Sequence, residues 1–440
     1  MQPLKSFVDS LKTAWSIPAL QARIKFVLFA FATQVFAIHV PVPGIDGSAM
    51  ERLFSSPFGG ALGLIDLFSG GALKSFSIVA MGILPYINAS IIMQLLGVAI
   101  PELEKKIKEG GESGRREINK YTRYLTLALS LFQAFLLVTT LQAEAGLGLT
   151  VLGRIQTMVS LTAGTMFLVW LGDRITEKGI GNGISLIIFG NIMISLPHSF
   201  AGIYELTRSG SISVFQVIMM VAAFILTVAG VTAMVQAERK IPVQHARRVV
   251  GGGKVTAGGS TYLPIKVNSA GVMPIIFAMA ALAIPNTIGG FAGNTWLGNI
   301  SRGISTFLTP SFTLGGMTAS LIYTVVIVFF TFFYTVVVMD IPQMSENLKK
   351  WNAFVPGIRP GKETTSYLDR VISRVTFAGA IFLAVIALAQ FLMPALLGIS
   401  GNVFPLYGGT SLLIVVGVAL ETMKAIEAQL MMRHYEGFIK

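Results

Sequence analysis

Cysteine is absent from this chain of 440 residues, and charged residues are scarce, at 12%. The first absence excludes disulfide bonds and cysteine–metal sites. The second excludes an ordinary soluble domain, in which about 25% of residues carry charge. The four histidines are scattered and form neither H-E-x-x-H nor H-x-x-E-H, so no metal ion or other cofactor is expected.

Charge is missing above all from about ten apolar stretches between Phe26 and Leu420, inside which no Asp, Glu, Lys or Arg occurs. Stretches of this length predict membrane-spanning helices, so we expect an all-α polytopic membrane protein. We place the spans near 22–40, 75–99, 121–142, 151–172, 183–203, 213–235, 268–290, 316–340, 374–396 and 406–426.

The absence of charged residues inside the spans also argues against two classes of membrane protein. A transporter coupled to ions or protons needs an acid or a broken-helix ion site at membrane depth, and the spans contain no such acid. An intramembrane protease needs a Ser–His, Asp–Asp or His–Glu set there, and none is present. We therefore expect no enzymatic activity and favour a barrier or conduit that is indifferent to charge.

Basic residues are distributed unevenly between the loops. Alternate loops divide the 33 Lys and Arg residues into 28 on the side that holds both termini and five on the other side. The positive-inside rule makes the first side cytoplasmic. The net charge of +12 is thus a cytoplasmic property, suited to anionic lipids, an acidic partner or RNA phosphates.

Five spans lie on each side of the loop at 199–212. An odd number of spans in each half predicts two halves of opposite orientation, 1–206 and 207–440, with a pathway between them. The halves show no clear sequence repeat, so this prediction rests on the number of spans.

The external connection 41–74 is too apolar for a simple loop. Its glycine pairs, Gly59-Gly60 and Gly70-Gly71, flank a run long enough for about two helical turns, which is too short to span a membrane. A short apolar helix on two hinges fits a re-entrant segment buried in protein. It fits equally an interfacial helix on the outer leaflet, and these residues alone leave both alternatives open.

Two cytoplasmic loops are unusually long and basic. The loop 236–267 predicts an extended ribbon with a glycine-rich tip, and its Gly-Gly-Gly-Lys run lacks P-loop spacing. In the loop 340–374, Pro356-Gly357 and Pro360-Gly361 bracket Arg359 and predict a stiff turn. A guanidinium presented in this way suits bidentate capture of a carboxylate or phosphate, although a solvated basic loop is the alternative.

Six ordered motifs resemble the SecY family, the pore subunits of bacterial Sec protein-conducting channels, and the resemblance covers nearly the whole chain. The motifs are 84–96, 109–116, 175–185, 263–268, 356–361 and 408–414. The resemblance implies a ten-helix clamshell of two inverted five-helix halves, with an hourglass pore and a re-entrant plug helix. It also implies the bacterial cytoplasmic membrane as location, SecE and usually SecG as subunits, and SecA or a translating ribosome as driving partner.

Motif matching carries the family's site residues onto this chain. The pore ring falls on Ile83, Ile87, Ile184, Ile188, Ile276 and Ile414. The plug, within 58–72, falls on Leu64, Ile65, Asp66, Leu67 and Phe68. The lateral gate, through which membrane-protein clients leave sideways into lipid, falls near Asn88, Gln94 and Asn268. The docking surface for SecA and the ribosome falls on Arg239, Arg247, Arg248, Lys254 and Arg359.

Physical arguments support these roles without deciding them. An apolar ring resists wetting and holds no passing polypeptide tightly. Without the resemblance, the six isoleucines would be assigned to packing or to lipid contact. Polar gate residues can form a weak, reversible seam, or serve as ordinary interhelical contacts.

Two positions depart from the family pattern. Asp66 stands where many relatives have an asparagine-containing run, and a carboxylate there must reach water or a partner. Asn352-Ala353 replaces a frequent glycine, so we expect a stiffer turn before Phe354.

Overall fold

The structure is a computed structural model. It describes residues 15–45, 50, 54, 66, 69–108, 110–145, 148–245, 248–250, 254–256, 260–279, 281, 296, 298, 300, 303–304, 314–396 and 409–436. Its helices are α2 (Pro18–Ile38), α5 (Leu84–Ala99), α6 (Pro101–Lys108), α7 (Gly111–Ala145), α8 (Val151–Lys178), α9 (Gly183–Arg208), α10 (Val214–Gln236), α13 (Leu314–Val338), α14 (Ile341–Lys350), α15 (Lys362–Leu396) and α16 (Gly409–Glu436). Its strands are β1 (Glu238–His245), β2 (Arg248–Val250), β3 (Lys254–Thr256), β4 (Ser260–Lys266) and β5 (Ala353–Phe354).

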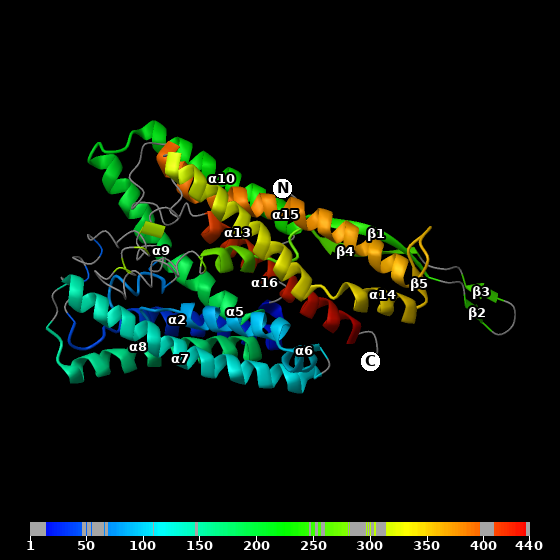
Figure 1. Cartoon of the computed structure of the whole chain (residues 1–440), viewed down its shortest axis with the longest axis horizontal. Coiled ribbons are helices and arrows are strands. Elements are labelled where there is room, and N and C mark those ends of the chain that lie inside the picture. Colours follow the sequence, from blue (N-terminus) through cyan, green and yellow to red (C-terminus); the bar gives the residue numbers. More distant parts are fainter. Residues whose placement is uncertain are drawn as a thin grey trace.

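The long helices form two bundles that lie side by side (Figure 1). The first contains α2, α5, α7 and α8, and the second contains α10, α13, α15 and α16. Helix α9 packs against α2 and α8 on one side and against α10 and α16 on the other. The predicted boundary at 206/207 falls in the last turn of α9 and stays a prediction.

The described helices agree with most of the predicted spans. Among the described residues, seven helices are long and apolar enough to cross a membrane, or eight if the bent pair α5–α6 is counted. Helix α16 covers the predicted span 406–426 from residue 409 onward. The predicted span 268–290 is described mainly up to residue 279, and 273–279 is helical.

The predicted second span, 75–99, is helical only from Leu84. Residues 70–83 form consecutive turns, and most of them are buried against the first bundle, although Lys74 and Ser75 are exposed. The Ile78 amide donates to the Val40 carbonyl oxygen at 2.9 Å. A Cβ on Gly164 would lie 1.8 Å from the Ile78 carbonyl oxygen, so glycine there lets α8 approach this backbone. Irregular backbone is tolerated at membrane depth only when it is buried in protein, as this segment is.

Five short strands gather at one end of the molecule, beside α14 (Figure 1). β1 pairs antiparallel with β4, from Glu238 opposite Lys266 to Gln244 opposite Ser260. β2 and β3 form a second antiparallel pair. These two pairs confirm the ribbon predicted for 236–267. A finding that was not predicted is that β5, from the other basic loop, pairs with the far edge of β1.

The sheet β4-β1-β5 rests on its own small apolar core. Ile241 and Val243 of β1 and Ile265 of β4 are buried against Leu368 and Ile372 near the start of α15. The alternation of buried and exposed residues along β1 is what an antiparallel strand with one covered face requires. The two basic loops are therefore one structural unit.

Candidate functional site: an apolar neck and a basic sheet

The six isoleucines predicted as a pore ring come from four separate segments. Ile83 is the N-cap of α5 and Ile87 lies one turn later, whereas Ile184 and Ile188 lie in the first turns of α9. Ile276 lies in the helical stretch 273–279, and Ile414 lies near the start of α16. All six belong to one hydrophobic cluster between the two bundles, which we call the neck cluster.

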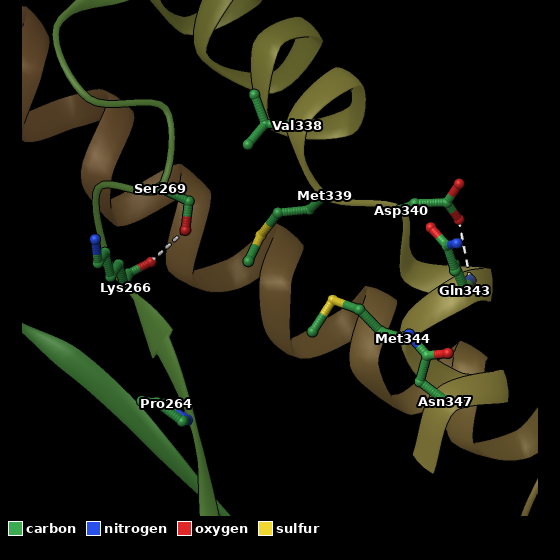
Figure 2. Close-up of a pocket in the computed structure, with 9 residues that line it drawn as sticks. All are labelled: Pro264, Lys266, Ser269, Val338, Met339, Asp340, Gln343, Met344 and Asn347. Carbon is green, nitrogen blue, oxygen red and sulfur yellow. Dashed lines mark hydrogen bonds between the residues drawn. The ribbon is translucent and has the colours of Figure 1, made fainter. Parts of the chain in front are cut away.

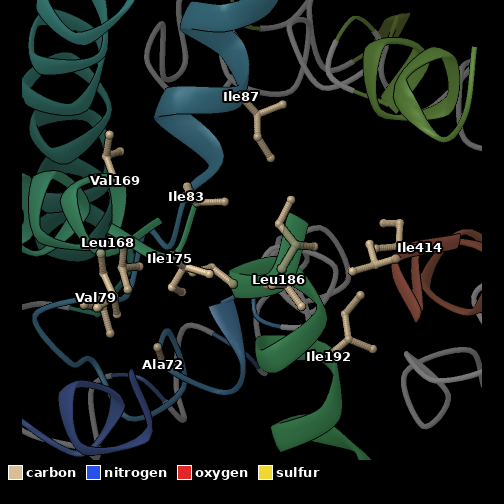
Figure 3. Packing of buried hydrophobic residues seen from close by; sticks show 14 of the residues in the cluster. Ala72, Val79, Ile83, Ile87, Leu168, Val169, Ile175, Leu186, Ile192 and Ile414 are labelled. Carbon is tan, nitrogen blue, oxygen red and sulfur yellow. The ribbon is translucent and has the colours of Figure 1, made fainter. Parts of the chain in front are cut away.

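The neck cluster is tightly closed around these side chains. Ile83, Ile87, Ile188 and Ile414 are exposed by only 1–6%, and Ile184 and Ile276 are half-buried against them. Figure 3 shows Ile87 of α5, Leu186 and Ile192 of α9, and Ile414 of α16 directed toward a common centre. Because all these groups are apolar, no hydrogen bond has to break when they separate. The geometry brings the predicted ring together, while its role as a pore remains a proposal.

An aromatic group fixes the stretch 273–279 against the second bundle. The ring of Phe277, which is 1% exposed, meets the rings of Phe330 and Tyr334 of α13 edge to face, with centroids 5.7 Å apart in both cases. This is the favoured arrangement for aromatic pairs. It sets the helical face from which Ile276 projects toward the neck cluster.

The three predicted gate residues are not joined to one another by any hydrogen bond among the described residues. Gln94 Nε2 donates to Ser90 Oγ of its own helix at 3.2 Å. Asn88 is half-buried on α5. The Asn268 Oδ1 atom is buried and has no hydrogen-bond partner within the described part of the chain. The polar seam expected between the second and seventh spans therefore stays a prediction.

Of the predicted plug residues, Leu64, Ile65, Leu67 and Phe68 lie outside the described residues, whereas Asp66 is described. Its carboxylate Oδ1 accepts a hydrogen bond from the Lys74 amide at 2.9 Å, and its carbonyl oxygen accepts from the Gly71 amide at 3.0 Å. The half-buried carboxylate of Asp66 thus has a hydrogen-bond partner. Burial nevertheless raises its pKa, although the amide bonds and the Lys74 charge act in the opposite direction.

Arg359 occupies a turn whose backbone needs glycine on both sides. Gly357 has φ of +80° and Gly361 has φ of +109°, values that a side chain makes costly. The Arg359 carbonyl oxygen accepts from Thr364 Oγ1 at 2.8 Å, and its side chain is exposed. The turn therefore presents the guanidinium to solvent from a fixed backbone.

The other predicted docking residues lie on or beside the strands. Arg239 is exposed on β1, opposite Ile265. Arg248 begins β2 and Lys254 begins β3, at opposite ends of the paired register. Arg247 lies outside the described residues. At the turn before β5, Asn352 adopts φ of +51°, which explains why glycine suits this position.

A groove of about 430 Å³ separates the sheet from the end of α13. Figure 2 shows Lys266 and Ser269 on one side and Met339, Asp340 and Met344 on the other. Asp340 caps α14 by accepting a hydrogen bond from the Gln343 amide at 3.0 Å. Pro264 and Lys266 of β4 and Ser269 line the groove, so it adjoins the predicted gate residue Asn268 in the chain.

Comparison with known proteins shows to which family a chain with this geometry belongs. The SecY family model matches residues 77–423. The protein translocase subunit SecY of Thermotoga maritima is 43% identical, and the match covers 98% of this chain and 98% of that protein. The protein translocase subunit SecY of Aquifex aeolicus is 41% identical, and the match covers 98% of this chain and 99% of that protein. The chain belongs to the SecY family.

Solved structures agree with this family's fold. A structure described as a protein-conducting channel superposes with a TM-score of 0.66 at 18% identity, covering 93% of this chain and 92% of that one. The Sec61 channel of a canine ribosome–channel complex gives a TM-score of 0.61 at 17% identity, with the same coverages. At these identities the likeness shows the fold, which is the ten-helix clamshell of a multi-pass membrane protein.

Within this SecY family chain, sequence reasoning missed a buried amide pair. Gln34 of α2 is 0% exposed and Asn191 of α9 is 1% exposed, and Gln34 Nε2 donates a hydrogen bond to Asn191 Oδ1. The available signal was one amide residue in the middle of each of two apolar spans.

Proposed function

We propose that this chain is the central subunit of a Sec translocon, a passive channel that passes secretory polypeptides across the membrane and releases membrane proteins sideways into lipid. The observation that carries the proposal is the neck cluster, in which six isoleucines from both bundles converge. An apolar neck resists wetting and blocks ions without a charged gate. It also offers a passing chain neither hydrogen bonds nor fixed charge, so clients of any sequence can move through.

The energy comes from a partner on the cytoplasmic side. The sheet β4-β1-β5 and the Arg359 turn form an exposed basic surface, suited to carboxylates of SecA or phosphates of ribosomal RNA. Among the relatives, the canine Sec61 and yeast Ssh1 structures are ribosome-bound channels. We further propose that SecE and SecG are subunits of the complex and that anionic lipids surround the basic face.

The location follows from the same reasoning. The uneven distribution of Lys and Arg supports a bacterial inner-membrane protein with both termini in the cytoplasm. The chain itself is proposed to need no cofactor and to catalyse no reaction.

The absence of native cysteine allows a direct test. A single thiol is introduced by Ile83→Cys, and a secretory precursor with one cysteine is stalled midway through export. We expect a disulfide between the two chains. A matched control is Leu226→Cys on α10, where the native side chain is 73% exposed on the outer face of the second bundle. Crosslinking at Leu226→Cys without crosslinking at Ile83→Cys would contradict the proposed path.

A further inference from the structure

The loop 179–183 between α8 and α9 is part of one of the six ordered motifs, yet none of the sites described above uses it. Its backbone is fixed by hydrogen bonds at the start of α9. The Gly183 amide donates to Thr176 Oγ1 at 2.9 Å, and Asn182 Oδ1 accepts from the Ile184 amide at 3.0 Å. An asparagine N-cap of this kind stabilises the first turn of a helix. The loop therefore leads into α9 with a defined shape.

Glycines at both ends of the loop let it pack closely against the first bundle. A Cβ on Gly179 would lie 2.8 Å from Val27 Cγ2 of α2, and a Cβ on Gly183 would overlap the Gly172 carbonyl oxygen of α8. Contacts this short leave no room for a side chain at either position. The loop is thus seated between α2 and α8.

The middle glycine of the loop, Gly181, faces α16 of the second bundle. A Cβ on Gly181 would lie 3.4 Å from Thr422 Oγ1 and 3.9 Å from Thr422 Cα, and its φ of +80° favours glycine as well. Thr422 Oγ1 donates to the Val418 carbonyl oxygen of its own helix at 2.8 Å. Its contact with the loop is therefore one of packing, and such a contact can turn without breaking a hydrogen bond.

Beside Gly181, a small apolar cluster joins the two bundles. It consists of Ile180 of the loop, Leu20 of α2 and Ile426 of α16, which are exposed by 3%, 5% and 9%. We call these three residues the end cluster. Close-packed apolar side chains hold two surfaces together without fixing a single orientation. Helix α16 thus rests against the first bundle at this end of α9.

The other end of α9 also holds the two bundles together. The chain itself runs there from α9 into α10 through residues 209–213, and Ile212 of this connection is buried with Ile203 of α9 and Met220 of α10. The 26 residues of α9 place the two ends about 39 Å apart. Two fixed points at opposite ends of one helix define an axis along α9, about which one bundle can rotate against the other.

We propose that the loop 179–183 is a bearing between the two bundles: it keeps α16 seated against the first bundle at this end of α9 while the neck cluster separates. The loop is then a positioning element for the ring, because Ile184 follows it directly and its contact Thr422 lies about two turns after Ile414 on α16. The consequence for export rests on the proposed channel function, whereas the contact itself can be tested separately.

The test uses the whole chain, assembled with its small partner subunits in vesicles. In Gly181→Cys/Thr422→Cys the two Cβ atoms would lie 4.0 Å apart, within the range of about 3.5–4.5 Å found in natural disulfides. As a control, Ile87→Cys/Ile414→Cys across the neck (Figure 3) is joined by a short thiol crosslinker. Export of a secretory precursor with SecA and ATP is measured for each pair in its joined and its unjoined form, so that the substitutions themselves are present in both.

We expect the disulfide between Gly181→Cys and Thr422→Cys to form and to leave the rate of export unchanged, because a bearing does not separate. The joined neck pair should lose export. A disulfide that fails to form would contradict the contact, and one that stops export would overturn the bearing. Export through the joined neck would contradict the proposed channel path, and with it the need for a bearing. If Gly181→Cys does not assemble, Ile180→Cys/Ile426→Cys of the end cluster is judged by the same criteria.

A second comparison tests the positioning of the ring. Gly181→Val adds a side chain against α16, whereas Gly44→Val places the same side chain at φ of +86° in open space, since nothing in the described part of the chain lies within 4 Å of a Cβ there. Both variants carry comparable backbone strain. We expect Gly181→Val to raise the ion leak of the idle complex severalfold, because α16 and with it Ile414 are displaced, and Gly44→Val to leave it unchanged. An equal leak in the two variants would assign the effect to strain and overturn the positioning role.

Discussion

The neck cluster and the basic sheet position their key residues in opposite ways. At the neck, apolar side chains from four segments meet by packing alone, and none needs a particular hydrogen bond. At the sheet, the side chain of Arg359 is exposed, and it is the backbone that is fixed, by two glycines with positive φ and by the Thr364 hydroxyl. In the proposed function, the neck can therefore open and reclose without breaking hydrogen bonds, whereas the sheet has to keep its shape to be recognised.

This difference matches the two roles proposed for these regions. Non-directional apolar contacts tolerate any geometry that keeps the surfaces together, so a neck built from them can adapt to many clients. A planar guanidinium recognises a carboxylate or phosphate only at the correct orientation. At the neck, a substitution should therefore matter when it changes an apolar side chain to a polar one. At the sheet, a substitution should matter when it changes the charge or the orientation of a side chain.

The largest expected effect follows from reversing the charge at Arg359. Arg359→Glu should reduce SecA-dependent secretion at least about 30-fold, because a central arginine of an interface contributes about 2–4 kcal/mol. Purified complexes should retain their thermal stability, since the side chain is exposed. Secretion into vesicles with ATP measures the effect.

The matched control is Arg174→Glu, a charge reversal at an exposed arginine on α8, remote from the sheet, that pairs with Glu177. It should have little effect on secretion. Equal losses in the two variants would mean that general basicity, and not the Arg359 turn, attracts the partner, and the contrast between sheet and neck would fail.

A smaller effect is expected from a polar group at the neck. Ile414→Asn places an amide where the native side chain is 3% exposed and packs in a cluster of apolar side chains. The closed state then contains an unsatisfied amide, whereas the open state hydrates it, so the ion leak should rise about tenfold. Ile414→Leu, which keeps the chemistry and changes the shape, should leak no more than the native chain. If Ile414→Asn and Ile414→Leu leaked ions to a similar extent, the shape of the side chain, and not its polarity, would determine how well the neck closes.

Sequence reasoning found the parts of both regions that carry local patterns. The ribbon 236–267 was predicted from its extended flanks and glycine tip, and the ring residues from motifs. It could not find β5, because two residues, Ala353 and Phe354, carry no strand pattern and pair with β1 only through the tertiary fold. The turns at 70–83 were missed for a related reason. Their sequence is apolar enough for a span, and the non-helical backbone is stabilised by distant partners such as Val40 and Gly164.

Asp66 combines the two modes of positioning, and it gives the smallest expected effect. It is a charged group on a fixed backbone, as at the sheet, but its side chain is half-buried, whereas that of Arg359 is exposed. Burial raises the pKa of its carboxyl, so, on the prediction that Asp66 belongs to a plug, the closed arrangement binds a proton more tightly than an open one in which Asp66 is hydrated. Protonation therefore stabilises closure. This gain is complete below the ordinary carboxyl pKa of about 3.9 and is lost as the pH rises through the raised value.

The ion leak of the native complex should accordingly fall as the pH is lowered from neutrality toward about 4. The change should be smaller than that caused by Ile414→Asn, because the Lys74 and Leu73 amides and the Lys74 charge oppose the cost of burial. Asp66→Asn keeps an acceptor for the Lys74 amide without the charge, so its leak should already be low at neutral pH and should not change with pH. An equal pH dependence in Asp66→Asn would assign the titration to another group. Asp66 would then be held in place by its amide bonds, with no contribution from its charge.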